Sequence, residues 1–422
     1  AHRKPYDFSK ETIGISMEKG LKENLAAKVS RGKAEELFAY LKEGFSSWDY
    51  ETIRSALDRL VSLAKDPRKK GTIIEGLTLA LDRRYPIADK RRRSLLQMLA
   101  DGLERIFRDV PLINGQAGKG YVRIDWENRG SLRAPKAGEE ILVMDVSAFP
   151  PEGDDCDARL VVDAYHLGWK RFICTGHKGQ RFLGCALGPD TKGVRIDAYG
   201  STGDYLGSGL DGLEIQVHGN GQDQLGQILK SGKLVIHGDV GQTFMYGAKG
   251  GEVYVLGNAA GRPLINAVGK PRVVINGTAL DFLAESFMAG DPYKGGGFVI
   301  LNGIAFDADG RCIPQDTPYP GSNLFSLAAG GAIFVRDPHH KLVSEQLNGG
   351  QFFPFGQREW ELILPYLQEN ERLFGISIEN DLLTVEGVKR KPEEVYRTIS
   401  AVKLSVLAAG EGAAINEEWE ED

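Results

Sequence analysis

Cysteine is scarce in this chain of 422 residues. The four cysteines, Cys156, Cys174, Cys185 and Cys312, are widely spaced and form no CxxC pair. This spacing argues against an iron–sulfur cluster or a structural zinc site held by this chain alone. A disulfide framework is typical of much shorter secreted chains. The simplest interpretation is a set of buried free thiols in a reducing compartment.

Long apolar runs and basic runs are also missing. No segment approaches the roughly 20 apolar residues that a membrane-spanning helix needs, and residues 1–10 are polar, without the apolar stretch of a secretory signal. The formal net charge is −6, and the basic cluster Lys90–Arg93 is short. Nucleic acid and anionic membranes attract proteins with a basic footprint, which this chain lacks. We therefore expect a cytoplasmic protein with no membrane span and no nucleic-acid partner.

Glycine, by contrast, is abundant and unevenly placed. The chain has 53 glycines, well above the usual share of roughly 7%, and most of them follow Gly168. This change in composition divides the chain into four expected parts. These are an extended N-terminal arm over residues 1–30, a helical domain with a short β linker over 31–150, a repeat domain over 151–340, and a C-terminal helical cap with an acidic tail over 341–422.

The helical domain is predicted from apolar residues at helical spacing. Three runs carry them, with Asp49 as a candidate cap of the second: Ala34, Leu37, Phe38 and Leu41; Ile53, Leu57, Leu60 and Leu63; Leu95, Leu96, Leu99, Leu103, Ile106 and Phe107. Each helix therefore has one stripe to bury. A small bundle and a docking module for another subunit both remain open.

An internal repeat dominates the glycine-rich part. Short β-rich runs end at Gly200, Gly219, Gly238, Gly257, Gly277 and Gly303, with spacings of 19, 19, 19, 20 and 26 residues. The positions four and two residues before each glycine are all apolar: Ile196 and Ala198, Ile215 and Val217, Leu234 and Ile236, Val253 and Val255, Val273 and Ile275, Val299 and Leu301. This is the alternation of a strand with one face turned inward.

One unit of this length cannot bury its own apolar positions, so the units must stack. We therefore predict a mainly β fold: a right-handed parallel β-helix (solenoid) with an N-terminal helical domain and a C-terminal α/β cap. Residues 324–335 resemble a further coil. The helical pattern of residues 154–168 is expected to cover one open end, and a C-terminal helix around residues 362–367 the other.

Several pieces of the repeat domain carry a family resemblance. They are GHKGQRFLG (176–184), GDYLGSGLDG (203–212), HGNGQDQLGQILKSGKLVIHGD (218–239), YGAKGGEVYVLGN (246–258) and DFLAESFMAG (281–290). In order and spacing they resemble the GXGXG domain of the glutamate synthase large (alpha) subunit family, from roughly residue 154 to 303. The pattern is also similar to one of the subunits of formylmethanofuran dehydrogenase.

The resemblance implies a function without chemistry in this chain. In the glutamate synthase family the domain packs between the amidotransferase and the FMN/iron–sulfur domains and holds their geometry. We therefore expect a structural, partner-binding subunit of a multi-subunit, glutamate-synthase-like oxidoreductase. FMN or FAD and iron–sulfur clusters would belong to its partners, with no cofactor or metal bound by this chain. A stand-alone β-helix enzyme and a member of a formyl-transfer complex are the alternatives.

Two histidines of the repeat are candidates for a site. His218 and His237 occupy equivalent positions 19 residues apart and should stack at about 5 Å. The following units place Leu256, Asn276 and Asn302 there, so the repeat supplies no third metal ligand. A ladder on the surface is the preferred interpretation over a metal pair, and His339 and His340 are expected to be a solvated pair.

Aspartates recur near the corners of the repeat, at positions 204, 223 and 281. Paired carboxylates could serve a glycosidase, but residues that accept backbone N–H groups at corners explain the recurrence better. In the stand-alone enzyme, Asp204, Asp223 and His218 would carry the reaction. The preferred interpretation assigns no catalytic, cofactor-binding or metal-binding residue.

Overall fold

The N-terminal part is a bundle of helices. The computed structural model describes residues 19–115 and 119–401, in which α1 (Lys19–Ser30), α2 (Ala34–Ser47), α3 (Tyr50–Leu63), α4 (Pro67–Asp82) and α5 (Arg92–Arg108) come first. The side chain of Asp49 caps α3 by accepting from the Thr52 N–H at 2.8 Å, as predicted. The extended arm is wrong for residues 19–30, which are helical, and the rest of that prediction lies outside the described residues.

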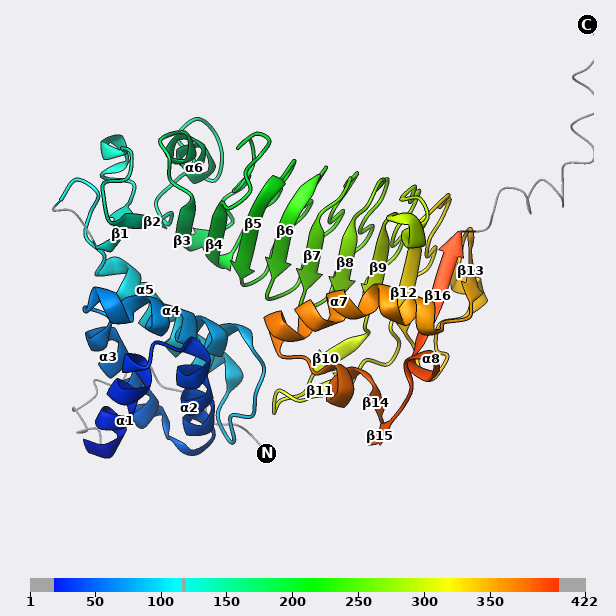
Figure 1. Cartoon of the computed structure of the whole chain (residues 1–422), viewed down its shortest axis with the longest axis horizontal. Coiled ribbons are helices and arrows are strands. Elements are labelled where there is room, and N and C mark those ends of the chain that lie inside the picture. The colour runs from blue at the N-terminus through cyan, green and yellow to red at the C-terminus, as the bar shows by residue number, and fades with distance from the viewer. Residues whose placement is uncertain (1–18, 116–118, 402–422) are drawn as a thin grey trace, which may run out of the picture.

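A single sheet of 12 strands forms the body of the molecule (Figure 1). Its order is β1-β2-β3-β4-β5-β6-β7-β8-β9-β12-β16-β13, parallel up to β12 and antiparallel at β16 and β13. The strands are β1 (Gly120–Ile124), β2 (Glu139–Asp145), β3 (Arg171–Lys178), β4 (Arg195–Ser201), β5 (Asp211–His218), β6 (Ser231–Ile236), β7 (Glu252–Val255), β8 (Arg272–Ile275), β9 (Phe298–Leu301), β12 (Ala332–Arg336), β13 (Gly350–Phe353) and β16 (Tyr396–Ala401).

Smaller elements complete the described chain. The helices α6 (Asp157–His166) and α7 (Gln357–Phe374) are accompanied by the single turn α8 (Pro392–Val395) and two hairpins, β10 (Ile304–Phe306) with β11 (Cys312–Pro314) and β14 (Thr384–Val385) with β15 (Val388–Lys389). Short turns are η1 (Arg129–Ser131), η2 (Pro292–Lys294), η3 (Ser344–Gln346) and η4 (Ile378–Leu382). None of the helices within 19–115 and 119–401 has the length and apolarity needed to span a bilayer.

The repeat predicted these strands and their register correctly. Ile196 lies beside Ile215, which lies beside Leu234 and then Val253, and all four are fully buried in one core. The further unit predicted at residues 324–335 is also present, since β12 pairs in parallel with β9. Apolar positions at period two thus stack strand upon strand, because each lies over its equivalent in the next repeat.

The predicted β-helix, however, is wrong. The structure is an α/β fold with one mostly parallel sheet and helices around it. The second half of each repeat forms turns rather than strands, because residues there adopt the left-handed backbone region, among them Tyr205, Gln224 and Met245. An extended strand cannot pass through that region. The apolar residues of these segments, such as Leu206 and Leu225, therefore pack against the sheet from turns.

Strands, not helices, continue the sheet at both ends. The β linker expected before residue 150 is instead β1 and β2, which extend the sheet beyond β3. Helix α6 confirms the helix predicted at 154–168, but it does not cover an end. Helix α7 runs across several strands (Figure 1) and packs on Tyr254 and Val274 of β7 and β8. The sheet then ends with β16 and β13.

The helical bundle packs on the same sheet. Its core includes Val143 of β2 and Ile173 of β3, and Thr78 of α4 shares a hydrogen bond of 2.7 Å with the hydroxyl of Tyr199 on β4. The two interpretations of the helices are thus joined, since the bundle docks on its own chain. The four cysteines are free, with Cys156 and Cys174 buried and the other two only partly so.

The corner aspartates act as predicted. A carboxylate oxygen of Asp204 accepts from the Asp223 N–H at 3.1 Å, and Asp223 in turn accepts from Gln242 at 2.7 Å. A second ladder repeats this pattern from Asn220 to Asp239 at 2.9 Å and from Asp239 to Asn258 at 2.7 Å. Each side chain therefore binds the backbone of the next repeat and holds neighbouring repeats in register.

Gly257→Ala is expected to destabilise the protein by about 1–3 kcal/mol, because overpacking at a rigid contact costs this much. A Cβ atom at Gly257 would lie 2.2 Å from Oδ1 of Asp239, the oxygen that binds the next backbone. Urea unfolding measures the loss. Gly130→Ala is the matched control, since a Cβ there meets nothing within 4 Å. Equal stability of the two variants would contradict the expected close contact.

Candidate functional site

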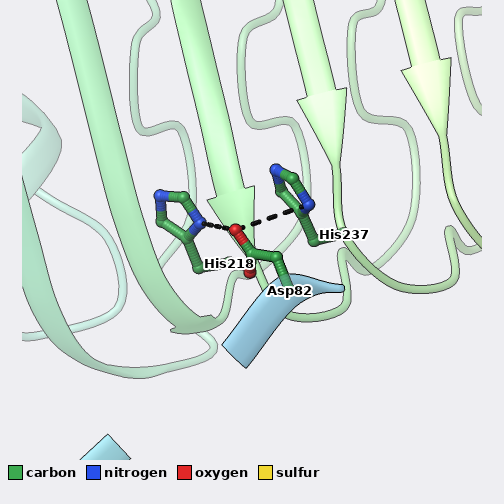
Figure 2. A group of neighbouring side chains, drawn as sticks. All are labelled: Asp82, His218 and His237. Atoms are coloured by element: carbon green, nitrogen blue, oxygen red, sulfur yellow. Dashed lines mark hydrogen bonds and ion pairs between the residues drawn. The ribbon is translucent and has the colours of Figure 1, made fainter. Parts of the chain in front are cut away.

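Asp82, His218 and His237 meet between the bundle and the sheet (Figure 2). Asp82 is the last residue of α4, His218 ends β5, and His237 directly follows β6. Oδ2 of Asp82 lies 2.8 Å from Nδ1 of His218 and 3.5 Å from Nδ1 of His237. All three residues are buried. A carboxylate from the helical domain is thus aimed at two equivalent positions of neighbouring repeats.

The two imidazole rings stack, as the repeat predicted. Their centroids are 5.2 Å apart, and the ring of Tyr199 stacks on the other side of His218 at 4.3 Å. The expected surface ladder is wrong, because only 6% of His218 and 7% of His237 are exposed. The helical bundle covers them, which the repeat alone could not indicate.

Sequence reasoning missed Asp82 altogether. It lies 136 residues before His218, outside the repeat. One signal was available: a carboxylate at the C-terminus of a helix faces the negative end of the helix dipole, which is unfavourable without a compensating partner. The two histidines are that partner.

A second layer of polar groups surrounds the histidines. Nε2 of His218 lies 3.5 Å from a carboxylate oxygen of Asp197 on β4, and Arg195 donates to that carboxylate at 2.7 Å. Nε2 of His237 lies 3.1 Å from Oε1 of Gln216, and the Gln216 amide donates to Glu214 at 2.7 Å. Each ring nitrogen that points away from Asp82 therefore faces an oxygen.

The electrostatics of the two rings differ. Burial opposes a charge on His218, but the carboxylates of Asp82 and Asp197 outweigh it and raise its pKa to about 9. Burial lowers the pKa of His237 to about 4, since the attraction of Asp82 is opposed there by His218 itself. Burial also opposes the charge of Asp82, but His218 and His237 hold its pKa below the usual value. At neutral pH the trio thus holds one buried imidazolium, one neutral imidazole and one carboxylate.

Two cavities border the trio. One of about 490 Å³ is lined by Asp82, His218 and His237 together with Arg84, Asn258 and Gln315. The other, of about 430 Å³, reaches the trio from the side of Asp197, Arg195 and Arg171. A proton or a metal ion held by the trio would therefore have space for a small ligand beside it.

The other candidate residues do not join this site. Asp204 and Asp223 use their carboxylates on backbone N–H groups of the following repeat. His339 lies 41% exposed in a loop, 3.9 Å from Glu386. Among the residues that the structure describes, the trio is the one cluster with enough ligands for a metal ion. The stand-alone enzyme built on Asp204, Asp223 and His218 therefore loses its basis.

Comparison with known proteins agrees with the resemblance. Residues 172–352 match the GXGXG motif family, so the match begins at β3 and ends in β13, later at both ends than the span of 154–303 expected from the quoted pieces. No curated protein matched the chain. His218 and His237 lie within the matched residues, whereas Asp82 lies before them.

Proposed function

Because residues 172–352 form a domain of the GXGXG motif family, related to glutamate synthase-like proteins, we propose that this chain is a structural and partner-binding subunit of a multi-subunit, glutamate-synthase-like oxidoreductase. The family match is the observation that carries the proposal. The partners would bring flavin, iron–sulfur clusters or an amidotransferase, and the assembly would reside in the cytoplasm.

The way the parts of the chain are joined supports a scaffold. Helix α7 is tied to the sheet by an ion pair of 2.8 Å between Lys233 and Glu369 and by two hydrogen bonds of 2.8 and 2.9 Å between Asn276 and Asn370. The last pair is completely buried. Buried polar groups that satisfy each other fix a single arrangement. Surfaces on the helices and on the sheet are therefore held at constant positions for partners.

A groove at the β13 end of the sheet is the surface best suited to a partner subunit. It has a volume of about 910 Å³ and is lined by residues of β12, β13, β16 and the loops beside them. Leu327, 74% exposed, and Phe353 contribute apolar surface to it. Strand β13 is the last strand of the sheet, and an open edge beside apolar side chains favours pairing with another protein.

Co-purification tests the proposal. The full chain, isolated from its native cells under mild conditions, is expected to carry other subunits and the visible absorption of flavin and iron–sulfur clusters. Leu327→Glu is expected to reduce the recovery of the subunit bound at the groove at least about 10-fold, because a central apolar contact of an interface contributes roughly 2 kcal/mol or more.

Val388→Glu is the matched control, since Val388 is also exposed but lies on the β14–β15 hairpin. Its complexes should be recovered as from the wild-type chain. Isolation of the native chain alone would overturn the proposed function, and equal recovery with Leu327→Glu would overturn the groove as the docking surface.

A further inference from the structure

We propose that Asp82, His218 and His237 bind one divalent transition-metal ion. Each residue offers one ligand atom, and these atoms all lie within 4.8 Å of one another. In a tetrahedral zinc site with bonds of about 2.0–2.1 Å the ligand atoms lie roughly 3.3 Å apart. The trio is thus close to the required spacing, with its ligands on three elements that the fold holds together.

The hydrogen bonds of Gln216 determine the tautomer of His237. The Gln216 amide N–H donates to Glu214, so its carbonyl oxygen faces Nε2 of His237 at 3.1 Å. Nε2 must then carry the proton, because two acceptors cannot bond to each other. Nδ1 is left with its lone pair directed toward Asp82.

This lone pair has no hydrogen-bond partner. Nδ1 of His237 is buried and unpaired, 3.5 Å from Oδ2 of Asp82. A buried polar atom without a partner is rare and calls for an explanation. A lone pair and a carboxylate repel each other across an empty space, but both bind a cation placed between them. The geometry at His237 therefore fits a metal ion better than it fits a proton.

His218 is oriented in the same way. Its Nε2 faces Asp197, which Arg195 holds in place, while Nδ1 faces Asp82. A second-layer oxygen on the distal nitrogen is the arrangement that orients metal-binding histidines. Without metal, a proton on Nδ1 joins His218 to Asp82, and the metal would take the place of this proton.

The donor set indicates which metals fit. Two imidazole nitrogens and a carboxylate suit zinc or ferrous iron, whereas magnesium and calcium prefer oxygen ligands. Three protein ligands leave a coordination position for water or a small ligand. That position would open toward the cavity of about 490 Å³, which Arg84 also lines. The inference departs from the expectation that this chain binds no metal, and it does not depend on any partner subunit.

Zinc binding to the lone full-length chain tests the inference. The protein is stripped with EDTA, the chelator is removed, and Zn²⁺ is titrated by calorimetry, with Co²⁺ as an absorption probe of the coordination. One ion per chain is expected. His237→Leu and Asp82→Asn should each weaken the affinity by at least about 100-fold, more than the loss of a second-layer group. Leucine is the residue that the next repeat places at this position, Leu256.

His339→Leu is the matched control and should bind as the wild-type chain does, because His339 lies in an exposed loop. Gln216→Ala leaves all three ligands in place and should weaken binding by about 10–100-fold. It provides the test if a ligand variant does not fold, as judged by circular dichroism. A wild-type chain that binds no Zn²⁺, or unchanged affinity in all three site variants, would overturn the inference.

Discussion

Asp82→Asn is expected to lower the free energy of unfolding by about 3–5 kcal/mol at pH 7, measured by urea denaturation in the presence of EDTA. Removing one partner of a buried ion pair costs this much, because the other charge stays buried without compensation. Here the stranded group is the His218 imidazolium, whose Nδ1 lies 2.8 Å from Asp82. Chelator ensures that the measurement reports the ion pair and not a bound metal.

The loss should depend on pH in a defined direction. The pKa of His218 is raised to about 9 from the value of 6.5 that an exposed histidine has. The pair therefore stabilises the fold fully below pH 6.5, and this stabilisation is lost as the pH rises through 9. The difference between wild type and Asp82→Asn should shrink accordingly at pH 10. Asp89→Asn, at a site 74% exposed, is the control and should change little. An equal effect of Asp82→Asn at pH 7 and pH 10 would contradict the assignment of the proton to His218.

Asp157→Asn is expected to have the opposite effect and to raise the free energy of unfolding by about 4 kcal/mol at pH 8. Asp157 begins α6 and is completely buried, and neither carboxylate oxygen has a hydrogen-bond partner. Burial raises its pKa to about 7 from 3.8, against a smaller effect of the Ala158 backbone N–H. A shift of about 3 units corresponds to about 4 kcal/mol.

The sign follows from the protons bound in the two states. Between pH 4 and pH 7 the folded protein keeps the proton of Asp157, whereas the unfolded chain has lost it, so stability falls as the pH rises through this window. Asparagine carries no charge and avoids the loss. The gain should therefore be small at pH 4 and complete at pH 8. The neighbouring Asp155→Asn, at a side chain 70% exposed, should stay within about 0.5 kcal/mol of wild type. A stability gain that is the same at both pH values would show that Asp157 is not the titrating group.

The strands could be predicted from the sequence because a repeat shows the same local pattern several times. Each unit places two apolar residues at period two before a glycine, and all of these became buried strand positions. The number of sheets could not be predicted in this way. Leu206 and Leu225 have the apolar character of strand residues, but their neighbours Tyr205 and Gln224 adopt left-handed backbone conformations. That choice depends on packing, since nothing in a tyrosine or a glutamine favours it locally.

The candidate site divides in the same way. The stacking of His218 on His237 follows from the register of the repeat, which is local information. Asp82 comes from another domain, and its position depends on how the bundle packs against the sheet. Burial, and with it the difference between the two pKa values, comes from the same long-range contact. One sequence without this contact therefore predicted the rings but neither their burial nor their third partner.

The repeats also set a length. Each one adds a strand at a spacing of ~4.8 Å, and helix α7 grips the sheet at two points, Lys233 on β6 and Asn276 after β8. One further 19-residue unit inserted between these points would move them apart by one strand spacing, and α7 could no longer reach both. The number of repeats is thus matched to the helix that lies across them. A protein of this architecture that gained or lost a repeat in this stretch would need a correspondingly altered helix, so the two should change together in evolution.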